Sequence, residues 1–223
     1  MEAILNNLQI EINENLYLKD PESSVLGKRI IQKSIELIHN LGFEQFTFKK
    51  LGVLLKSNES SIYRYFENKH KLLLYLTSWY WSWIENQVAI ATVIIDNKRD
   101  KLETAIRIIC TEVVQDSSYE HINEVLLSKI IVAENTKAHH TKEVDTENRE
   151  GYFKVYKRLI NRIKDMVAAV DPTYEYPLSL ASTMVEGTLH QHFLQHHFTA
   201  ITDCGVQTGP TDYFIDLTKR LLH

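Results

Sequence analysis

Apolar residues recur at intervals of three and four along most of this chain, and this spacing constrains the fold more than any other feature of the sequence. Such intervals place side chains on one face of an α-helix. Glycine and proline, which punctuate the turns of all-β proteins, number only 7 and 4 in 223 residues. We therefore expect an all-α protein. This apolar face is clearest between 146 and 170, where it comprises Tyr152, Tyr156, Leu159, Ile163, Met166 and Val170.

The expected helices begin and end at residues with suitable capping chemistry. Gly42 suits the left-handed end of a helix. Thr47, Asn58 and Asn68 suit helix starts, because their side-chain oxygens can accept a free backbone N–H. We expect about nine helices, which cover residues 23–41, 47–55, 59–66, 69–93, 98–117, 121–135, 146–170, 176–199 and 211–222.

Composition favours a soluble protein. Hydrophobic residues make up 44% of the chain and charged residues 24%, both ordinary for a globular domain. The N-terminus carries acids where a signal peptide needs bases, and no apolar stretch is long enough to span a membrane. Cys110 and Cys204 have no metal-type or redox-type spacing and fit buried thiols in a reducing compartment. We expect a cytoplasmic protein with no cofactor and no membrane partner.

Charge is distributed unevenly along the chain. Residues 28–76 hold nine bases and four acids, a net charge of +5, whereas 1–27 sum to −4 and 77–223 to −5, for a total of −4. A basic block inside an acidic chain is typical of a local phosphate contact. A solvated basic face remains the alternative.

The same segment has the layout of a helix-turn-helix module, because three short expected helices follow one another with short turns between them. In such modules the second helix of the pair lies in the DNA major groove. In the expected helix 59–66, Ile62 and Phe66 lie four residues apart and pack inward. Five side chains of this helix are expected to face outward and, apart from the arginine, are short or hydroxylated: Ser60, Ser61, Tyr63, Arg64 and Tyr65.

Three stretches carry a family resemblance: 40–43 (NLGF), 46–52 (FTFKKLG) and 61–73 (SIYRYFENKHKLL). With them, residues 28–76 resemble the DNA-binding domain of the TetR (tetracycline repressor) family of bacterial regulators. The resemblance implies a three-helix DNA-binding domain joined by a long fourth helix to a helical ligand-binding and dimerisation domain. The implied divisions are an N-terminal arm at 1–22, a helix-turn-helix domain at 23–76 and an effector-binding and dimerisation domain at 77–223.

The resemblance also implies which residues contact DNA. Arg64 is the candidate for bidentate reading of guanine. Thr47 stands at a helix start, where the helix dipole favours an anion. The implied set is Thr47, Lys49, Lys50, Tyr63, Tyr65 and Lys69 at phosphates, with Lys49 also within reach of a base, and Ser60, Ser61 and Arg64 at bases.

The chain departs from the family pattern in the turn between the two short helices. The family commonly has Ala-Gly-Val there, and this chain has Leu55-Lys56-Ser57. A lysine in place of glycine costs roughly 1 kcal/mol if the turn requires a positive φ. Either the turn geometry differs, or Lys56 tolerates the strain and adds a phosphate contact.

The C-terminal part of the chain holds candidates for an effector site. Tyr75, Trp79 and Trp83 recur at four-residue steps, which fits a helical core face or the floor of an apolar ligand pocket. His192 and His196 are also four apart, a spacing that can hold zinc, although no third ligand is evident. The cluster His190–His197 also fits polar residues at a dimer seam or a pH-sensitive interface.

The sequence therefore predicts a DNA-binding transcriptional regulator. We expect a repressor that acts as a homodimer on a palindromic operator in double-stranded DNA and is released by a small apolar or amphipathic ligand. The alternatives are a metal- or pH-responsive regulator that uses the histidine cluster, a regulator that needs no ligand, and a helical enzyme. No GxSxG, HExxH or phosphate-loop motif is present, so we expect no catalytic residue.

Overall fold

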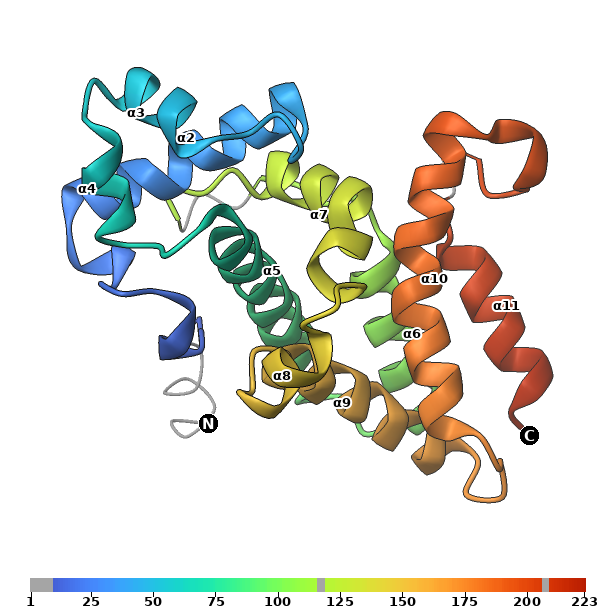
Figure 1. Ribbon diagram of the computed structural model, residues 1–223. Helices are drawn as coiled ribbons and strands as arrows, with labels where there is room; N and C mark the ends of the chain where they lie inside the picture. The colour runs from blue at the N-terminus through green and yellow to red at the C-terminus, as the bar shows by residue number, and fades with distance from the viewer. Residues whose placement is uncertain (1–9, 116–118, 206–208) are drawn as a thin grey trace. The chain divides into compact units, whose positions relative to one another are not determined.

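The protein is all-α, as the spacing of apolar residues predicts (Figure 1). A computed structural model describes residues 10–115, 119–205 and 209–223, and within them it contains α-helices, three short 3-10 helices and no strand. The α-helices are α2 (Val25–Leu41), α3 (Phe48–Leu55), α4 (Glu59–Tyr63), α5 (Lys69–Thr92), α6 (Lys98–Cys110), α7 (Glu124–His139), α8 (Val144–Arg149), α9 (Lys154–Val170), α10 (Pro177–His197) and α11 (Thr211–Leu221). The 3-10 helices are η1 (Glu14–Leu16), η2 (Pro21–Ser23) and η3 (Thr199–Ile201).

The expected capping residues stand at the helix ends. Thr47 Oγ1 accepts the amide hydrogen of Lys50 at 3.2 Å and begins α3. Asn58 and Asn68 cap α4 and α5 in the same way, at 3.0 and 2.9 Å. The backbone at Gly42, which follows α2, has φ +76°. The three helix starts and the helix end at Gly42 are confirmed, although the ψ of Gly42, 157°, differs from that of a left-handed helical cap.

The helix expected over 146–170 is corrected to two helices, α8 and α9. The break lies at Gly151, whose φ of +82° is accessible to glycine at little cost and interrupts the helical hydrogen bonds. Tyr152 lies between the two helices and is buried. The spacing of apolar residues therefore continues across the break and does not indicate where the helix is interrupted. The helix expected over 98–117 also ends early, at Cys110, and residues 116–118 lie outside the described part of the chain.

The chain packs into two compact units. The N-terminal unit comprises Glu11–Tyr80 and Val113–Lys154, and the C-terminal unit is formed mainly by Trp81–Glu112 and Val155–His223. Helix α5 begins in the first unit and ends in the second. The domain boundaries that the sequence suggests, after residues 22 and 76, stay a prediction.

The segment before α2 is part of the N-terminal unit's packing. Leu16 is fully buried, and the amide of Leu18 donates to the carbonyl of Tyr65 at 2.8 Å. Pro21 crosses the first turn of α2 so closely that a Cβ on Gly27 would lie 2.2 Å from its carbonyl oxygen. On another side of the unit α2 packs against α7. The first helices of the chain are therefore supported by residues that come both before and long after them.

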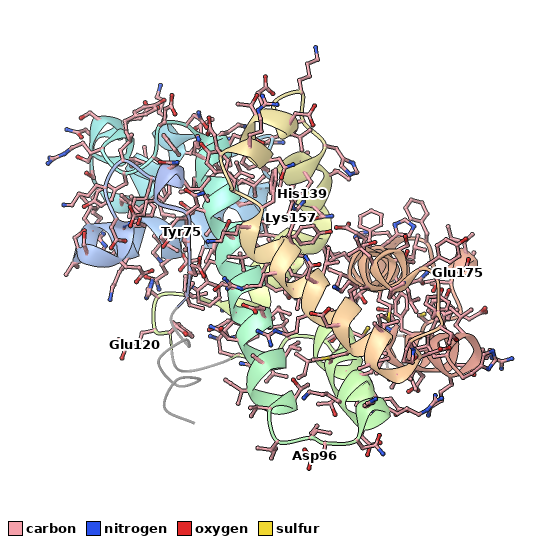
Figure 2. All side chains as sticks on the ribbon, turned by 90° about the horizontal axis from the view of Figure 1, so that it is seen from below. Tyr75, Asp96, Glu120, His139, Lys157 and Glu175 are labelled. Atoms are coloured by element: carbon pink, nitrogen blue, oxygen red, sulfur yellow. The ribbon has the colours of Figure 1, made fainter. Side chains whose placement is uncertain are left out.

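In the C-terminal unit, α6 packs against both α10 and α11, which lie side by side (Figure 1). The ring of Phe214 on α11 fills the space above Gly187 on α10, where a Cβ would lie 2.8 Å from it. Figure 2 shows Asp96 on the turn that joins α5 to α6. No helix in the described residues is both long enough and apolar enough to span a membrane.

Candidate nucleic-acid interface

Helices α3 and α4 are joined by a tight turn, Lys56-Ser57-Asn58. Lys56 takes a left-handed backbone conformation, with φ 54° and ψ 42°. The amide of Ser57 donates to the carbonyl of Gly52 at 2.9 Å, and a Cβ on Gly52 would lie 2.9 Å from the Ser57 oxygen. The turn therefore has the left-handed geometry in which glycine is favoured, and Lys56 occupies it.

The start of α3 presents a hydroxyl and two ammonium groups to solvent. Thr47 is exposed even though its hydroxyl caps the helix, and Lys49 is also exposed. Lys50 is exposed too, and its ammonium donates to the carbonyl of Gln45 at 2.8 Å. Cations at this helix start lie beside free backbone N–H groups, an arrangement that suits an anionic ligand.

Helix α4 presents hydroxyl groups and, directly after its end, an arginine. The hydroxyls of Ser60 and Ser61 donate to Asn58 Oδ1 at 2.8 and 2.7 Å, and they keep lone pairs for other donors. Tyr63 is 46% exposed, with its ring edge-on to Phe48 at 5.0 Å. Arg64 is exposed and follows α4 as its C-cap. This face can both donate and accept hydrogen bonds.

Tyr65 lies inside the module. Its side chain is 4% exposed, and its hydroxyl shares a hydrogen bond of 2.8 Å with Ser24 Oγ at the start of α2. The hydrogen bond with Ser24 lowers the pKa of Tyr65, and the nearby Lys19 ammonium adds to this effect. In this structure Tyr65 therefore links the end of α4 to α2.

Lys69, the first residue of α5, lies under the loop between α2 and α3. Its ammonium donates to the carbonyls of Phe43, Glu44 and Phe46 at 3.0, 3.2 and 3.4 Å. It also lies 4.6 Å from the centroid of the Phe43 ring. An ammonium has three hydrogens, so these carbonyls account for its full donor capacity.

Sequence reasoning missed a second support of this loop, which comes from α7. The buried Glu134 accepts the amide hydrogen of Phe43 at 3.0 Å. Lys137 pairs with Glu44 at 3.2 Å and with Glu134 at 2.8 Å, and its hydrogen bond to Glu134 raises its pKa. These residues are about ninety positions apart in the chain, and no local pattern signals their contact.

The aromatic residues singled out for ligand binding are buried. In the N-terminal unit, Tyr75 packs edge-on to Phe66 at 5.4 Å and Trp79 edge-on to Tyr119 at 5.1 Å. Burial raises the pKa of Tyr75 above its ordinary value. Trp83 is 7% exposed and belongs to the C-terminal unit. The three side chains thus contribute to the packed interior of the units.

The two candidate metal-binding histidines lie on α10. His192 Nε2 is 3.0 Å from the carbonyl oxygen of Cys110, and burial lowers the pKa of His192. His196 Nε2 is 3.9 Å from a carboxylate oxygen of Glu112. Within the described residues, no three histidine, cysteine or acidic side chains are grouped as metal ligands would be.

The fold matches solved structures although no family model and no curated protein matches the sequence. AibR, solved with isovaleryl coenzyme A and operator DNA, is 15% identical, with 86% of this chain and 96% of that chain covered and a TM-score of 0.57. The TetR-family transcriptional regulator PfmR from Thermus thermophilus is 10% identical, with 87% and 97% covered and a TM-score of 0.56. The superantigen PfiT is 16% identical, with 92% and 98% covered and a TM-score of 0.58.

This chain therefore has the fold of TetR-family transcriptional regulators. The same fold occurs in a protein described as a superantigen. A fold can host unrelated functions, so an argument about function has to rest on the residues of the site.

Proposed function

We propose that this protein is a TetR-family transcriptional regulator that binds a specific sequence in double-stranded DNA. The observation that carries the proposal is the polar surface of α3 and α4: hydroxyl, ammonium and guanidinium groups are exposed there on two capped helices joined by a tight turn. These are the groups that contact phosphates and base edges in protein–DNA complexes.

The residues of this surface take two roles. Thr47, Lys49, Lys50 and Tyr63 contact the phosphate backbone and set the register of the module on DNA. Ser60, Ser61 and Arg64 face the base edges, and Arg64 reads a guanine through its two parallel N–H groups. Lys69 and Tyr65 hold the α2–α3 loop and the end of α4 in position, because the structure engages both of them internally.

The proposed regulator acts as a homodimer on a palindromic operator. Exposed apolar side chains lie at both ends of α10, on η3 and on α11, and they support a second copy of the chain as the partner, since clustered exposed apolar side chains mark interaction sites. They are Tyr176, Leu178, Phe198, Ile201, Tyr213 and Leu221. A two-fold dimer presents two recognition helices to two half-sites of DNA, so the operator is palindromic.

The proposed regulator represses transcription and is released by a small apolar or amphipathic ligand bound by the helical region 77–223. Release requires that the ligand bind more tightly to a conformation that misfits the operator. DNA binding and release by a ligand are measured separately. If the operator complex persists with every ligand tried, the release proposal fails and the DNA-binding proposal is unaffected.

Selection of duplexes from a random DNA pool, at two salt concentrations, tests the function. We expect enrichment of one palindrome and affinity that falls steeply with salt, since each neutralised phosphate contributes about 0.9 to the slope of log K against log salt. Enrichment of no sequence by a folded protein contradicts the proposal.

Arg64→Ala tests the base-reading role. We expect a loss of about 1–3 kcal/mol of binding free energy and a relaxed preference at one base pair per half-site. Arg149→Ala is the matched control, because Arg149 is also exposed and lies on α8 of the same unit. An Arg64 variant that binds as tightly and as selectively as its Arg149 counterpart removes the assignment.

A further inference from the structure

A groove of about 460 Å³ lies in the C-terminal unit between the first turn of α6 and residues 158–169 of α9. Its volume falls within the range of roughly 300–1,000 Å³ that is usual for small-molecule sites. Four of the side chains that line it are basic, and the apolar Met166 and Ala169 line it as well. The basic residues are Lys98, Lys101, Arg158 and Arg162.

A buried carboxylate holds the two arginines side by side. Glu85 is 3% exposed; one of its oxygens accepts from Nε and Nη2 of Arg158 at 2.9 and 2.8 Å. The other accepts from Nε and Nη2 of Arg162 at 3.2 and 2.8 Å. Both guanidinium groups therefore have a fixed orientation, yet their side chains stay 36% and 38% exposed. Glu85 contributes one negative charge beside the two positive charges of the arginines.

The lysines stand where a helix disfavours them. Lys98 is the first residue of α6, and Lys101 lies in the same first turn. The positive end of the helix dipole is at this terminus, so cations there destabilise the helix. Residues that break such a local rule tend to be functional.

The charge balance of the groove sets the class of ligand. The four bases exceed the two acids, Glu85 below the arginines and Asp165 on the lining, by two charges. Asp165 also pairs with Lys164, which lies outside the lining, at 2.6 Å, so the excess of positive charge around the groove is at least two. A phosphate monoester carries about −1.5 to −2 charges at neutral pH and three acceptor oxygens, which match this excess. Guanidinium groups and ammonium groups both bind phosphate well.

We propose that this groove binds the phosphate group of a small phosphate ester, with Lys98, Lys101, Arg158 and Arg162 at the phosphate and the ester's apolar part against Met166 and Ala169. Glu85 acts as a positioning residue that orients the two guanidinium groups. The proposal is independent of DNA binding, because it concerns a ligand site in the C-terminal unit alone.

Calorimetric titration of the full chain with phenyl phosphate tests the proposal. We expect one site per chain, tighter binding than for inorganic phosphate, which lacks the apolar part, and tighter binding than for benzoate, which has one charge. The double variant Lys98→Ala/Lys101→Ala removes two charged contacts without touching Glu85, and we expect it to weaken binding about tenfold or more. Arg162→Lys keeps the positive charge beside Glu85 but removes the planar guanidinium with its parallel N–H donors. We expect it to lower the affinity less than the double variant does.

The matched control is Lys142→Ala/Lys157→Ala, which removes the same charge from exposed positions outside the groove. Lys157 lies on α9 itself (Figure 2). We expect the control to retain the parent's affinity, and circular dichroism to show all variants folded. A parallel titration uses lipid vesicles that contain phosphatidic acid. Three results overturn the proposal: no saturable binding of phenyl phosphate, a loss of affinity in the control equal to that in the Lys98/Lys101 variant, or binding to the vesicles alone.

Discussion

At the scale of single residues, Lys56 is the one non-glycine residue with positive φ in the described parts of the chain. A side chain in this conformation costs roughly 1–2 kcal/mol because its Cβ crowds the following carbonyl oxygen. The turn nevertheless keeps its close approach between Ser57 and Gly52. The sequence allowed either a different turn geometry or a strained Lys56. The structure has the left-handed turn, so Lys56 tolerates the strain.

We expect Lys56→Gly to raise the free energy of unfolding by about 0.5–1 kcal/mol, since glycine enters the left-handed region without that crowding but loses more entropy on folding. Denaturant titration measures the change. Lys56→Ala is the control, because it removes the charge and keeps the Cβ, so its stability should stay near that of the parent. If Lys56 also contacts a phosphate, both variants bind DNA more weakly and to the same extent.

His192 makes a prediction about pH. Burial lowers its pKa below the ordinary 6.5, so as pH falls the unfolded chain takes up a proton before the folded chain does. The contribution of the neutral, buried His192 to stability is therefore fully present above about pH 6.5, and it is lost as the pH falls through the lowered pKa of the folded state. We expect His192→Gln to lose less stability over that interval than the parent, as measured by denaturant titration at several pH values. His190→Gln, at an exposed position on the same helix, should follow the parent.

At the scale of elements, the loop that begins α3 is held from two sides. Glu134 on α7 accepts the Phe43 amide, and Lys69 on α5 donates to three carbonyls of the same loop. Since α3 begins immediately after this loop, the orientation of the proposed DNA-contacting helices depends on α7, a helix that contributes no residue to the surface itself.

We expect Glu134→Ala to lower the free energy of unfolding by about 1–3 kcal/mol, because it leaves the buried Phe43 N–H without its acceptor. Glu134→Gln keeps an acceptor oxygen and should cost less. Hydrogen exchange adds a local measurement: the Phe43 amide should exchange faster in the alanine variant than in the glutamine variant. Equal exchange in the two would show that Glu134 does not protect this amide.

The helix boundaries show what local chemistry can predict. Thr47, Asn58 and Asn68 have the side-chain oxygens that cap helices, and each does so. The division at Gly151 was missed because the apolar spacing continues on both sides of it, and a single glycine is also tolerated inside helices. Whether a glycine bends the chain depends on tertiary packing, which the local pattern does not contain.

At the scale of the whole molecule, the proposed DNA surface and the proposed phosphate groove differ in how visible they are in the sequence. The first occupies one contiguous segment, 47–64, so its residue types and spacing could be interpreted together. The second combines residues near 85, 100 and 160, and its only local signal is the four-residue spacing of Arg158 and Arg162. The burial of Tyr65 and the engagement of Lys69 also depend on partners distant in the chain.

The dimer prediction belongs to this scale. We expect light scattering to give twice the chain mass of 26.0 kDa for the parent. Tyr213→Glu places a charge on the exposed apolar surface of α11 and should give a monomer that binds the palindrome weakly. Ile94→Glu, at a residue that is 83% exposed outside that surface, should remain dimeric. Dimers of both variants would mean that α11 does not form the interface.

The contact of Glu85 with Arg158 and Arg162 has a consequence for how this protein can evolve. Loss of the carboxylate first removes the anion that both guanidinium groups share, whereas loss of both arginines first leaves the buried anion without these two partners. Loss of Glu85 is therefore less harmful after one arginine is lost, and loss of the second arginine is less harmful after Glu85 is lost. We expect the three positions to covary among related proteins, with lineages that keep Glu85 retaining at least one of the two arginines.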